Sequence, residues 1–454
     1  MFKIPYIKSL IATLLVSISI ISCYPELALP VKASFQYQFI DADASVPVTV
    51  AIENTSTGGD QFEWFFEGAT PEYSTDENPG QIRYEAPGTY TLKQIVSNVD
   101  GSIDTIEKSI TLADEININF EATIVDSSYS PVSVALNNMT QGEGLTYAWS
   151  FEGGTPETST AQQPENIIFE TSGTHNIHLS VSNGFETLTE TKSIEVAPQL
   201  TSAFSWEVNF EDDDLQVPLQ INTSNNSISA TDYLWTITGP ESLTSTEIEP
   251  IFTLTTEGTY TLSLTASNGK QNLIHSETIE VYANTGLRNL EDIRFGINKA
   301  HNTNVEAAFF STSLRQNFTA NQITTDNGAA IDIAFLGLNN SFTFNQFVSP
   351  DQVQTHGFTA IPNATTTQFI NSQELCECPA SLSATDFDAM TNDDLLDALD
   401  ISTTPTGVLA FDRELLPRIV LFENASGKKG AIKIKAFVED GDQAYLLCDL
   451  KYQK

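Results

Sequence analysis

Positively charged residues, cysteine, methionine and long hydrophobic runs are all scarce in this chain of 454 residues. Lysine and arginine number 20 against 59 aspartate and glutamate residues, so the formal net charge is −39. A field of that sign repels phosphate backbones, which excludes nucleic-acid binding and disfavours anionic lipid surfaces. Beyond the N-terminal segment, no stretch approaches the roughly 20 apolar residues that a membrane-spanning helix needs. The 40% of hydrophobic residues is still too much for a disordered chain.

The N-terminus has the pattern of a targeting segment. Lys3 and Lys8 precede an apolar stretch over residues 9–21, which has the length of a signal-peptide core. The stretch leads into Ile-Ile-Ser and then Cys23, a pattern that resembles the bacterial lipobox, whose cysteine is lipidated. The resemblance implies a signal peptide over residues 1–22, a lipidated Cys23 with a tether over residues 23–32, and an outer-membrane protein that faces the cell exterior. The alternative is an ordinary signal peptide with an incidental cysteine.

A period of 85 residues organises the next part of the chain. Trp64 and Trp149 are 85 residues apart, and Trp235 follows 86 residues later. The same period relates Pro71 and Pro156, Gly88, Gly173 and Gly258, and Asn98, Asn183 and Asn268. Self-similarity at a fixed spacing marks a tandem array of modules. We place these modules at residues 33–113, 114–198 and 199–283, the third being the most divergent.

Each repeat contains short runs in which apolar and polar residues alternate, as in residues 46–50 and 260–264. Period-two runs separated by Gly, Pro, Asn and Asp predict antiparallel β-sandwiches. The repeats resemble PKD domains, which are immunoglobulin-like sandwiches. The resemblance rests on a Trp-x-Phe core, a Gly-Thr-Tyr strand start and a Ser-Asn pair. A Gly-x-Thr-Pro turn, associated with surface lipoproteins of glycan-foraging bacteria, replaces the usual Gly-Asp-Gly. It follows from the repetition that Trp64, Trp149 and Trp235 are core residues.

Residues 284–454 lack the period and are predicted to form a larger β-sandwich with one or two short helices. Residues 331–335, 342–344 and 431–438 alternate as strands do, and Thr391-Asn392-Asp393-Asp394 predicts a helix start. This domain holds 12 basic and 21 acidic residues, a net of −9, whereas the repeats hold 5 and 37, a net of −32. The whole chain is thus predicted to be all-β, with tandem immunoglobulin-like sandwiches followed by a different C-terminal domain.

Catalytic motifs are missing from the sequence. It contains no His-Glu-x-x-His, no Gly-x-Ser-x-Gly and no phosphate-binding loop, so we expect no enzyme activity and no cofactor. Calcium could be held by Asp212-Asp213-Asp214 or by Asp386, Asp388, Asn392 and Asp393. A solvated turn and an acidic helix start are the preferred interpretations of these two groups. Among the cysteines, we expect Cys448 to form a disulfide with Cys376 or Cys378.

These patterns favour a non-catalytic surface lipoprotein that captures a polysaccharide for uptake or degradation, alongside an outer-membrane glycan transporter. Sugars bind on aromatic faces with a few amides and charged groups nearby. The candidate binding residues are Trp206, Arg315, Asn339, Asn340, Phe342, Phe344 and Phe347. Trp206 shares strand parity with Phe204 and Val208, so a core position is its alternative.

The charge of the chain predicts a neutral glycan, with a β-glucan of the laminarin type as the first choice, because a polyanion would be repelled. Only Lys428, Lys429, Lys433 and Lys435 form a basic cluster, and we interpret it as solubilising. Two alternatives to glycan binding stay open. One is an adhesin or protein-interaction scaffold, and the other is a divergent polysaccharidase with two carboxylates about 5–10 Å apart.

Overall fold

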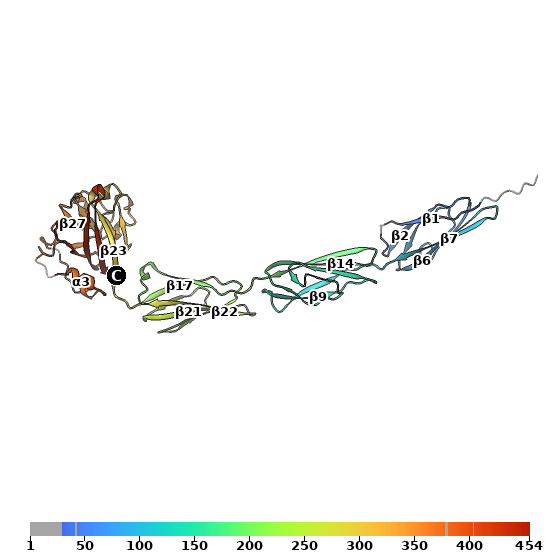
Figure 1. Ribbon diagram of the computed structural model, residues 1–454, viewed down its shortest axis with the longest axis horizontal. Coiled ribbons are helices and arrows are strands. Elements are labelled where there is room, and N and C mark those ends of the chain that lie inside the picture. Colours follow the sequence, from blue (N-terminus) through green and yellow to red (C-terminus); the bar gives the residue numbers. More distant parts are fainter. Residues whose placement is uncertain (1–29, 41–42, 377–379, 403) are drawn as a thin grey trace, which may run out of the picture.

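The computed structural model describes residues 30–40, 43–376, 380–402 and 404–454. Three small β-modules follow one another end to end, and a larger C-terminal domain bends away from their line (Figure 1). The regular structure is dominated by antiparallel sheets, so the predicted all-β class is confirmed. None of the helices in the described ranges has the length and hydropathy of a membrane-crossing helix.

Each module is a sandwich of two sheets. Module 1 has the strand orders β1-β2-β5 and β4-β3-β6-β7, and modules 2 and 3 repeat this arrangement. Module 1 contains β1 (Phe35–Phe39), β2 (Val48–Asn54), β3 (Gln61–Phe66), β4 (Tyr73–Ser74), β5 (Gly80–Tyr84), β6 (Gly88–Ser97) and β7 (Ile103–Leu112). Module 2 contains β8 (Phe120–Val125), β9 (Val132–Asn138), β10 (Thr146–Phe151), β11 (Gly154–Thr155), β12 (Thr158–Ser159), β13 (Ile167–Phe169), β14 (Gly173–Ser182) and β15 (Thr187–Val196). Module 3 contains β16 (Phe204–Val208), the short 3-10 helix η1 (Phe210–Asp212), β17 (Leu219–Asn225), β18 (Asp232–Thr238), β19 (Leu243–Ser245), β20 (Ile251–Leu254), β21 (Gly258–Ser267) and β22 (Asn272–Val281).

One tryptophan lies in the core of each module. Trp64, Trp149 and Trp235 are at most 2% exposed. A phenylalanine of the first strand meets each indole edge-on, with ring centroids 5.4, 5.1 and 5.2 Å apart in modules 1, 2 and 3. The burial of large aromatic rings is the main source of stability in sandwiches of this size.

The longest strands of the modules begin at a repeated glycine. Gly88, Gly173 and Gly258 open β6, β14 and β21, each ten residues long. Their φ angles are +151°, +123° and +136°, which L-residues with a side chain rarely adopt. The backbone of this entry turn therefore explains why glycine recurs at the 85-residue spacing.

The C-terminal domain packs two sheets around a phenylalanine-rich core. Their strand orders are β23-β31-β30-β29-β28 and β25-β24-β26-β27. The strands are β23 (Leu287–Gly296), β24 (Phe309–Ser311), β25 (Gln316–Phe318), β26 (Ile333–Gly337), β27 (Asn345–Val348), β28 (Gln368–Ile370), β29 (Arg418–Glu423), β30 (Lys429–Val438) and β31 (Tyr445–Gln453). The helices are α2 (Asn298–Asn302), α3 (Ala384–Ala389) and α4 (Asp394–Asp397), and the 3-10 helices are η2 (Ala320–Gln322), η3 (Gly328–Ala330), η4 (Pro350–His356) and η5 (Gly441–Gln443). The small helices α3 and α4 pack on the face of the five-stranded sheet opposite to the main core.

Three local predictions for this domain need correction. The strand predicted at residues 331–335 is β26 at Ile333–Gly337, and its burial does not alternate, because both faces of the strand are covered. Residues 342–344 form no strand, because Phe342 has a φ of +52° and turns the chain into β27. The capping box lies at Ser383 and Asp386 of α3, whereas α4 starts after Asp393 without a side-chain cap.

Candidate functional site at the C-terminal domain

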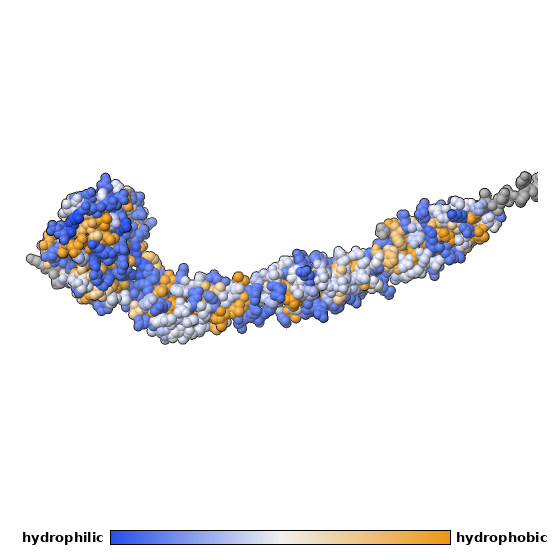
Figure 2. Space-filling view, viewed as in Figure 1, coloured by the Kyte–Doolittle hydropathy of each residue, from blue (hydrophilic) through white to orange (hydrophobic). Residues whose placement is uncertain are grey.

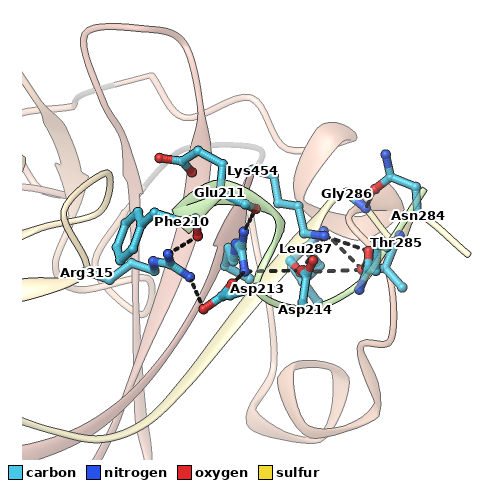
Figure 3. A network of polar contacts seen from close by, with 12 residues as sticks. Phe210, Glu211, Asp213, Asp214, Asn284, Thr285, Gly286, Leu287, Arg315 and Lys454 are labelled. Carbon is cyan, nitrogen blue, oxygen red and sulfur yellow. Dashed lines mark hydrogen bonds and ion pairs between the residues drawn. The ribbon is translucent and has the colours of Figure 1, made fainter. Parts of the chain in front are cut away.

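An ion-pair network joins module 3 to the C-terminal domain (Figure 3). After β16, the helix η1 leads into the acidic residues 212–214, which are a calcium candidate in the sequence. One carboxylate oxygen of Asp213 accepts a hydrogen bond from Arg288 Nη1 at 2.5 Å. The other accepts a hydrogen bond from Arg315 Nη1 at 2.6 Å. Asp214 lies 2.5 Å from Lys454 Nζ and 3.2 Å from Arg288 Nη1. Two carboxylates of module 3 thus meet three cations of the C-terminal domain, and we call this set of five residues the elbow network.

Backbone contacts reinforce the elbow network. The guanidinium groups of Arg288 and Arg315 also donate to the carbonyl oxygens of Glu211 and Phe210, respectively. The Arg315 guanidinium carbon lies 3.5 Å from the centroid of the Phe210 ring, a cation–π geometry. Both arginine side chains are nearly buried, with 10% and 11% of their surface exposed. Burial raises the pKa of Asp213, but the hydrogen bonds and charges of Arg315 and Arg288 lower that pKa by more. The pKa of Asp213 is therefore below its ordinary value of 3.8.

The segment between β22 and β23 also contacts module 3 at this junction, and a cavity lies beside it. Thr285 donates from its backbone N–H to Gln216 of module 3 at 2.8 Å, and the same amide oxygen accepts from Lys454 Nζ. Beside the network lies a polar cavity of about 280 Å³, lined in part by Arg315, Asp332 and Lys428. Asp332 is held by the backbone N–H of Thr312 at 2.8 Å, although burial raises the pKa of its carboxyl group. The ion pairs and hydrogen bonds beside the cavity fix an orientation between the two domains.

Four of the predicted sugar-binding residues are buried or bonded to other side chains of the protein. Phe342 and Phe347 are 0% and 1% exposed, so neither can stack on a ligand, because both fill the core between the two sheets. Arg315 lines the cavity but is committed to Asp213. Trp206 is half-buried against the core of module 3, and its indole N–H donates to Glu277 at 2.8 Å. These four residues therefore have structural roles.

The remaining three candidates form one exposed turn. Asn339 holds the turn with its side chain, accepting from the backbone N–H of Ser341 at 3.1 Å and donating to the Thr343 hydroxyl at 2.7 Å. Asn340 is exposed at the tip, and Phe344 is 41% exposed at the end of the turn. We call residues 338–344 the Phe344 turn.

Aliphatic side chains lie near the Phe344 turn. Leu338 is 61% exposed, and its backbone N–H donates to the Phe344 carbonyl at 3.1 Å. The neighbouring segment 408–411 pairs with Asn345, and its Leu409 is 46% exposed. A patch of apolar side chains is visible in the region of β27 in the space-filling view (Figure 2).

Comparison with known proteins assigns one of the modules. Residues 123–196 match the PKD domain. Module 2 is a PKD domain. The matched range runs from β8 to the end of β15 and includes Trp149 and Gly173, two of the residues that carry the 85-residue period. Module 3 and module 1 share the strand order of this PKD domain, with small differences in their edge strands.

The comparison with curated proteins found no match. Among solved structures, the chain is similar to the FN1–FN3 domains of chicken CNTN1, at 11% identity over 56% of this chain and 97% of that chain, with a TM-score of 0.20. It is also similar to a 1.5-MDa bacterial ice-binding adhesin, at 9% identity over 56% of this chain and 98% of that chain, with a TM-score of 0.25. A third similar structure holds extracellular cadherin domains 3–6 of protocadherin gamma B2, at 11% identity over 86% of this chain and 96% of that chain, with a TM-score of 0.27.

The described residues contain no group of three or more His, Cys, Asp or Glu side chains arranged to hold a metal ion. In the acidic run, Asp213 and Asp214 are engaged by cations, which accounts for these carboxylates without calcium. Asp386 belongs to the capping box of α3, and Asp388 lies 2.5 Å from Lys433 Nζ. In each of the two groups considered for calcium, two carboxylates are thus engaged with protein partners.

The predicted disulfide of Cys448 is wrong. Cys448 is a free thiol on β31, fully buried in the core between the two sheets. Cys376 is disulfide-bonded and packs against the cluster on the other face of the five-stranded sheet. The sheet itself therefore separates Cys448 from Cys376, while Cys378 and the lipobox Cys23 lie outside the described residues.

Burial raises the pKa of the Cys448 thiol well above its ordinary value, so little thiolate is available for reaction. We expect Cys448 to resist a thiol reagent such as Ellman's reagent in the native protein and to react completely after unfolding in urea. The Cys448→Ala variant should lose that one protected thiol and no other. Rapid labelling of Cys448 in the folded protein would contradict the buried position.

Proposed function

We propose that this protein is a non-catalytic surface stalk that presents its C-terminal domain to a ligand away from the membrane. The observation that carries the proposal is the division of the chain into two kinds of structure. Three slender modules are joined end to end, and a different, larger domain is held at their far end by the elbow network (Figure 1). Spacers of this kind increase reach, and a braced junction keeps the terminal domain in one orientation.

The ligand we propose is a neutral polysaccharide, with a laminarin-type β-glucan as the first choice. The basic cluster that a polyanion would need is largely occupied. Lys433 pairs with Asp388, Lys435 lies 2.6 Å from both Asp292 and Asp449, and the Lys429 ammonium donates to a backbone carbonyl at 2.8 Å. Hydrogen bonds to the two carboxylates raise the pKa of Lys435 to about 12. A neutral glycan needs none of these charges.

The Phe344 turn supports a sugar contact, because one short turn carries both an exposed aromatic ring and the exposed Asn340. Affinity gel electrophoresis of the mature chain with laminarin or alginate in the gel tests the proposal. We expect retardation by laminarin alone, insensitive to added salt, and roughly tenfold weaker binding, about 1.4 kcal/mol, for Phe344→Ala. Phe185→Ala is the matched control, since Phe185 is a 49% exposed phenylalanine of the PKD domain.

Equal retardation of the two alanine variants by laminarin would remove the Phe344 turn from the proposal. Retardation by alginate alone, lost in salt, would overturn the choice of a neutral glycan. A protein partner, as for an adhesin, is the second candidate. It is favoured by the exposed aliphatic side chains of Leu338 in the turn and Leu409 in the neighbouring segment, because large exposed apolar patches mark protein interfaces.

Lipid anchoring at Cys23 is part of the proposed function. We expect Cys23→Ser to release the protein from the membrane fraction, because the lipid is attached to the sulfur of the lipobox cysteine, which serine lacks. Fractionation of cells that express wild type or variant, followed by immunoblotting, measures the change. The Cys448→Ala variant, which removes a cysteine from the core, should stay in the membrane fraction. A Cys23→Ser variant that remained lipidated and membrane-bound would refute the anchor.

A further inference from the structure

The outer face of the four-stranded sheet of module 1 carries an exposed aromatic pair. Phe65 on β3 and Tyr73 on β4 are paired in register and are 40% and 48% exposed. Their ring centroids lie 5.2 Å apart. Of the aromatic ring contacts between described residues, this one alone joins two exposed side chains. Contiguous apolar side chains exposed on a protein surface often mark an interaction site.

The same face is hollowed on either side of this pair. A hollow of about 560 Å³ is lined by Phe62, Ile95 and Ile103, among others, and Ile103 is 67% exposed. A second hollow of about 360 Å³ is lined by Phe65 and Lys93. Apolar side chains are also visible on the surface of this module at the right of the space-filling view (Figure 2). We call this surface of β4, β3, β6 and β7 the module 1 face.

The other two modules provide an internal comparison, because strand pairing fixes equivalent positions. The positions of Phe65 and Tyr73 are occupied by Ser150 and Thr158 in the PKD domain. In module 3 they are occupied by Thr236 and Thr244. The pair Glu63 and Ile95 becomes Ala148 and Ser180, and then Leu234 and Thr265. Module 3 keeps aliphatic side chains at Leu234 and Ile274 but has no ring at these positions. The fold does not require aromatic residues here, so their presence in module 1 needs another reason.

Negative charge surrounds the apolar part of the module 1 face. Asp60, Glu63 and Glu77 line the larger hollow, and Glu67 and Glu72 line the smaller one. None of these five carboxylates forms an ion pair with a described residue. The one cation of the face, Lys93, lies 2.9 Å from a sixth carboxylate, Glu107. A second copy of this acidic chain would be repelled here, whereas a basic partner would be attracted.

We propose that the module 1 face is a docking surface for a segment of another protein that combines basic and apolar side chains. Lysine and arginine of the partner meet the unpaired carboxylates, and an arginine can also stack on the rings of Phe65 and Tyr73. Apolar side chains of the partner cover Ile95 and Ile103. This docking is independent of the ligand proposed for the C-terminal domain, since the two surfaces lie at opposite ends of the chain (Figure 1).

Random peptides displayed on phage provide the probe. They are selected on the mature chain and counter-selected on F65S/Y73T/I95S, a variant that introduces the PKD-domain residues of the equivalent positions and leaves the net charge unchanged. We expect the enriched peptides to be basic, with interspersed apolar residues. Synthetic copies should bind the triple variant at least roughly tenfold more weakly and lose affinity when salt is added. Phe185→Ser is the control for loss of an exposed ring elsewhere.

The single variant Phe65→Ser serves in place of the triple variant if circular dichroism shows that the latter is unfolded. Glu63→Gln with Glu77→Gln should weaken the same peptides and flatten their salt dependence. The proposal is overturned if no peptide distinguishes wild type from the variants, or if the enriched peptides are neutral or acidic. It is also overturned if F65S/Y73T/I95S loses binding to a neutral polysaccharide, because the face would then belong to a glycan. Loss of laminarin binding in Phe344→Ala alone leaves the docking surface unaffected.

Discussion

Replacing Trp149 by alanine is expected to lower the free energy of unfolding of the PKD domain by about 3–5 kcal/mol. The indole is 2% exposed, and its N–H donates to the carbonyl of Ala161 at 2.9 Å. Its ring meets Phe120 edge-on at 5.1 Å and stacks on Phe151 at 6.1 Å. Alanine would leave a cavity between the two sheets and remove the indole hydrogen bond to Ala161, and both effects destabilise the module.

Scanning calorimetry of the mature chain measures the effect, because each module can unfold as a separate unit. One transition should move to a lower temperature while the others stay in place. The equivalent variants of Trp64 and Trp235 should act alike, since their indole N–H groups also donate to a carbonyl twelve residues later, at 3.0 and 3.1 Å. Trp206→Ala, at a half-buried tryptophan, should have a smaller effect. An unshifted thermogram for Trp149→Ala would contradict its position in the core.

The Trp149→Ala variant also tests whether the modules act only as spacers. A spacer module contributes nothing to ligand contact, so Trp149→Ala should leave laminarin retardation of the C-terminal domain unchanged at a temperature where the other domains are folded. Loss of binding in a chain whose modules all remain folded by circular dichroism would show that the modules take part in recognition.

The repeats were the most predictable part of the fold, because their constraints are local and are stated three times. A glycine is needed where φ is positive at the start of β6, β14 and β21, and an aromatic residue is needed at the centre of each small core. Repetition at one spacing separates such requirements from chance. Comparing the repeats position by position would also have revealed the module 1 face, since Phe65 stands where the other copies have Ser150 and Thr236.

The C-terminal domain was less predictable, because its core is assembled from distant segments. The first and last strands, β23 and β31, are neighbours in one sheet, and burial of Phe342 and Phe347 depends on that long-range packing. The number of phenylalanine residues in the sequence could not show which ring remains in solvent. Phe344 is the exposed one because the turn held by Asn339 directs the chain outwards after Phe342.

The role of Arg315 could not be inferred from the sequence for a similar reason. Its partner Asp213 lies 102 residues away in another module, and the contact exists only once both domains are folded. Asp212, Asp213 and Asp214 are indistinguishable in the sequence, yet two of them bind cations. In the structure, Asp212 forms no ion pair with a described residue. This difference supplies a matched pair of variants.

Asp213→Asn is expected to loosen the orientation of the C-terminal domain on module 3, whereas Asp212→Asn is not. The change removes the anionic acceptor shared by Arg288 and Arg315, and hydrogen bonds to charged groups contribute about 1.5–3 kcal/mol each. Asp213 is 51% exposed, so solvent screening reduces this figure. We expect a loss of about 1–2 kcal/mol in docking free energy, or roughly a tenfold larger population of undocked chains. Both variants remove one negative charge, so a general charge effect would appear equally in both.

The elbow should also respond to acid in a defined direction. Asp213 has a pKa below its ordinary value of 3.8, because the arginines outweigh its burial. A carboxylate with a lowered pKa contributes its full stabilisation above the ordinary value and loses it as the pH falls through the lowered one. A donor–acceptor dye pair on module 3 and the C-terminal domain should therefore report a fixed distance near neutral pH and a broad distribution only below about pH 4. Moderate salt should weaken the elbow only in part, since the two arginine side chains are nearly buried while Asp213 is 51% exposed. A distance distribution that is already broad at neutral pH, or identical for Asp213→Asn and Asp212→Asn, would show that the network does not hold the domain.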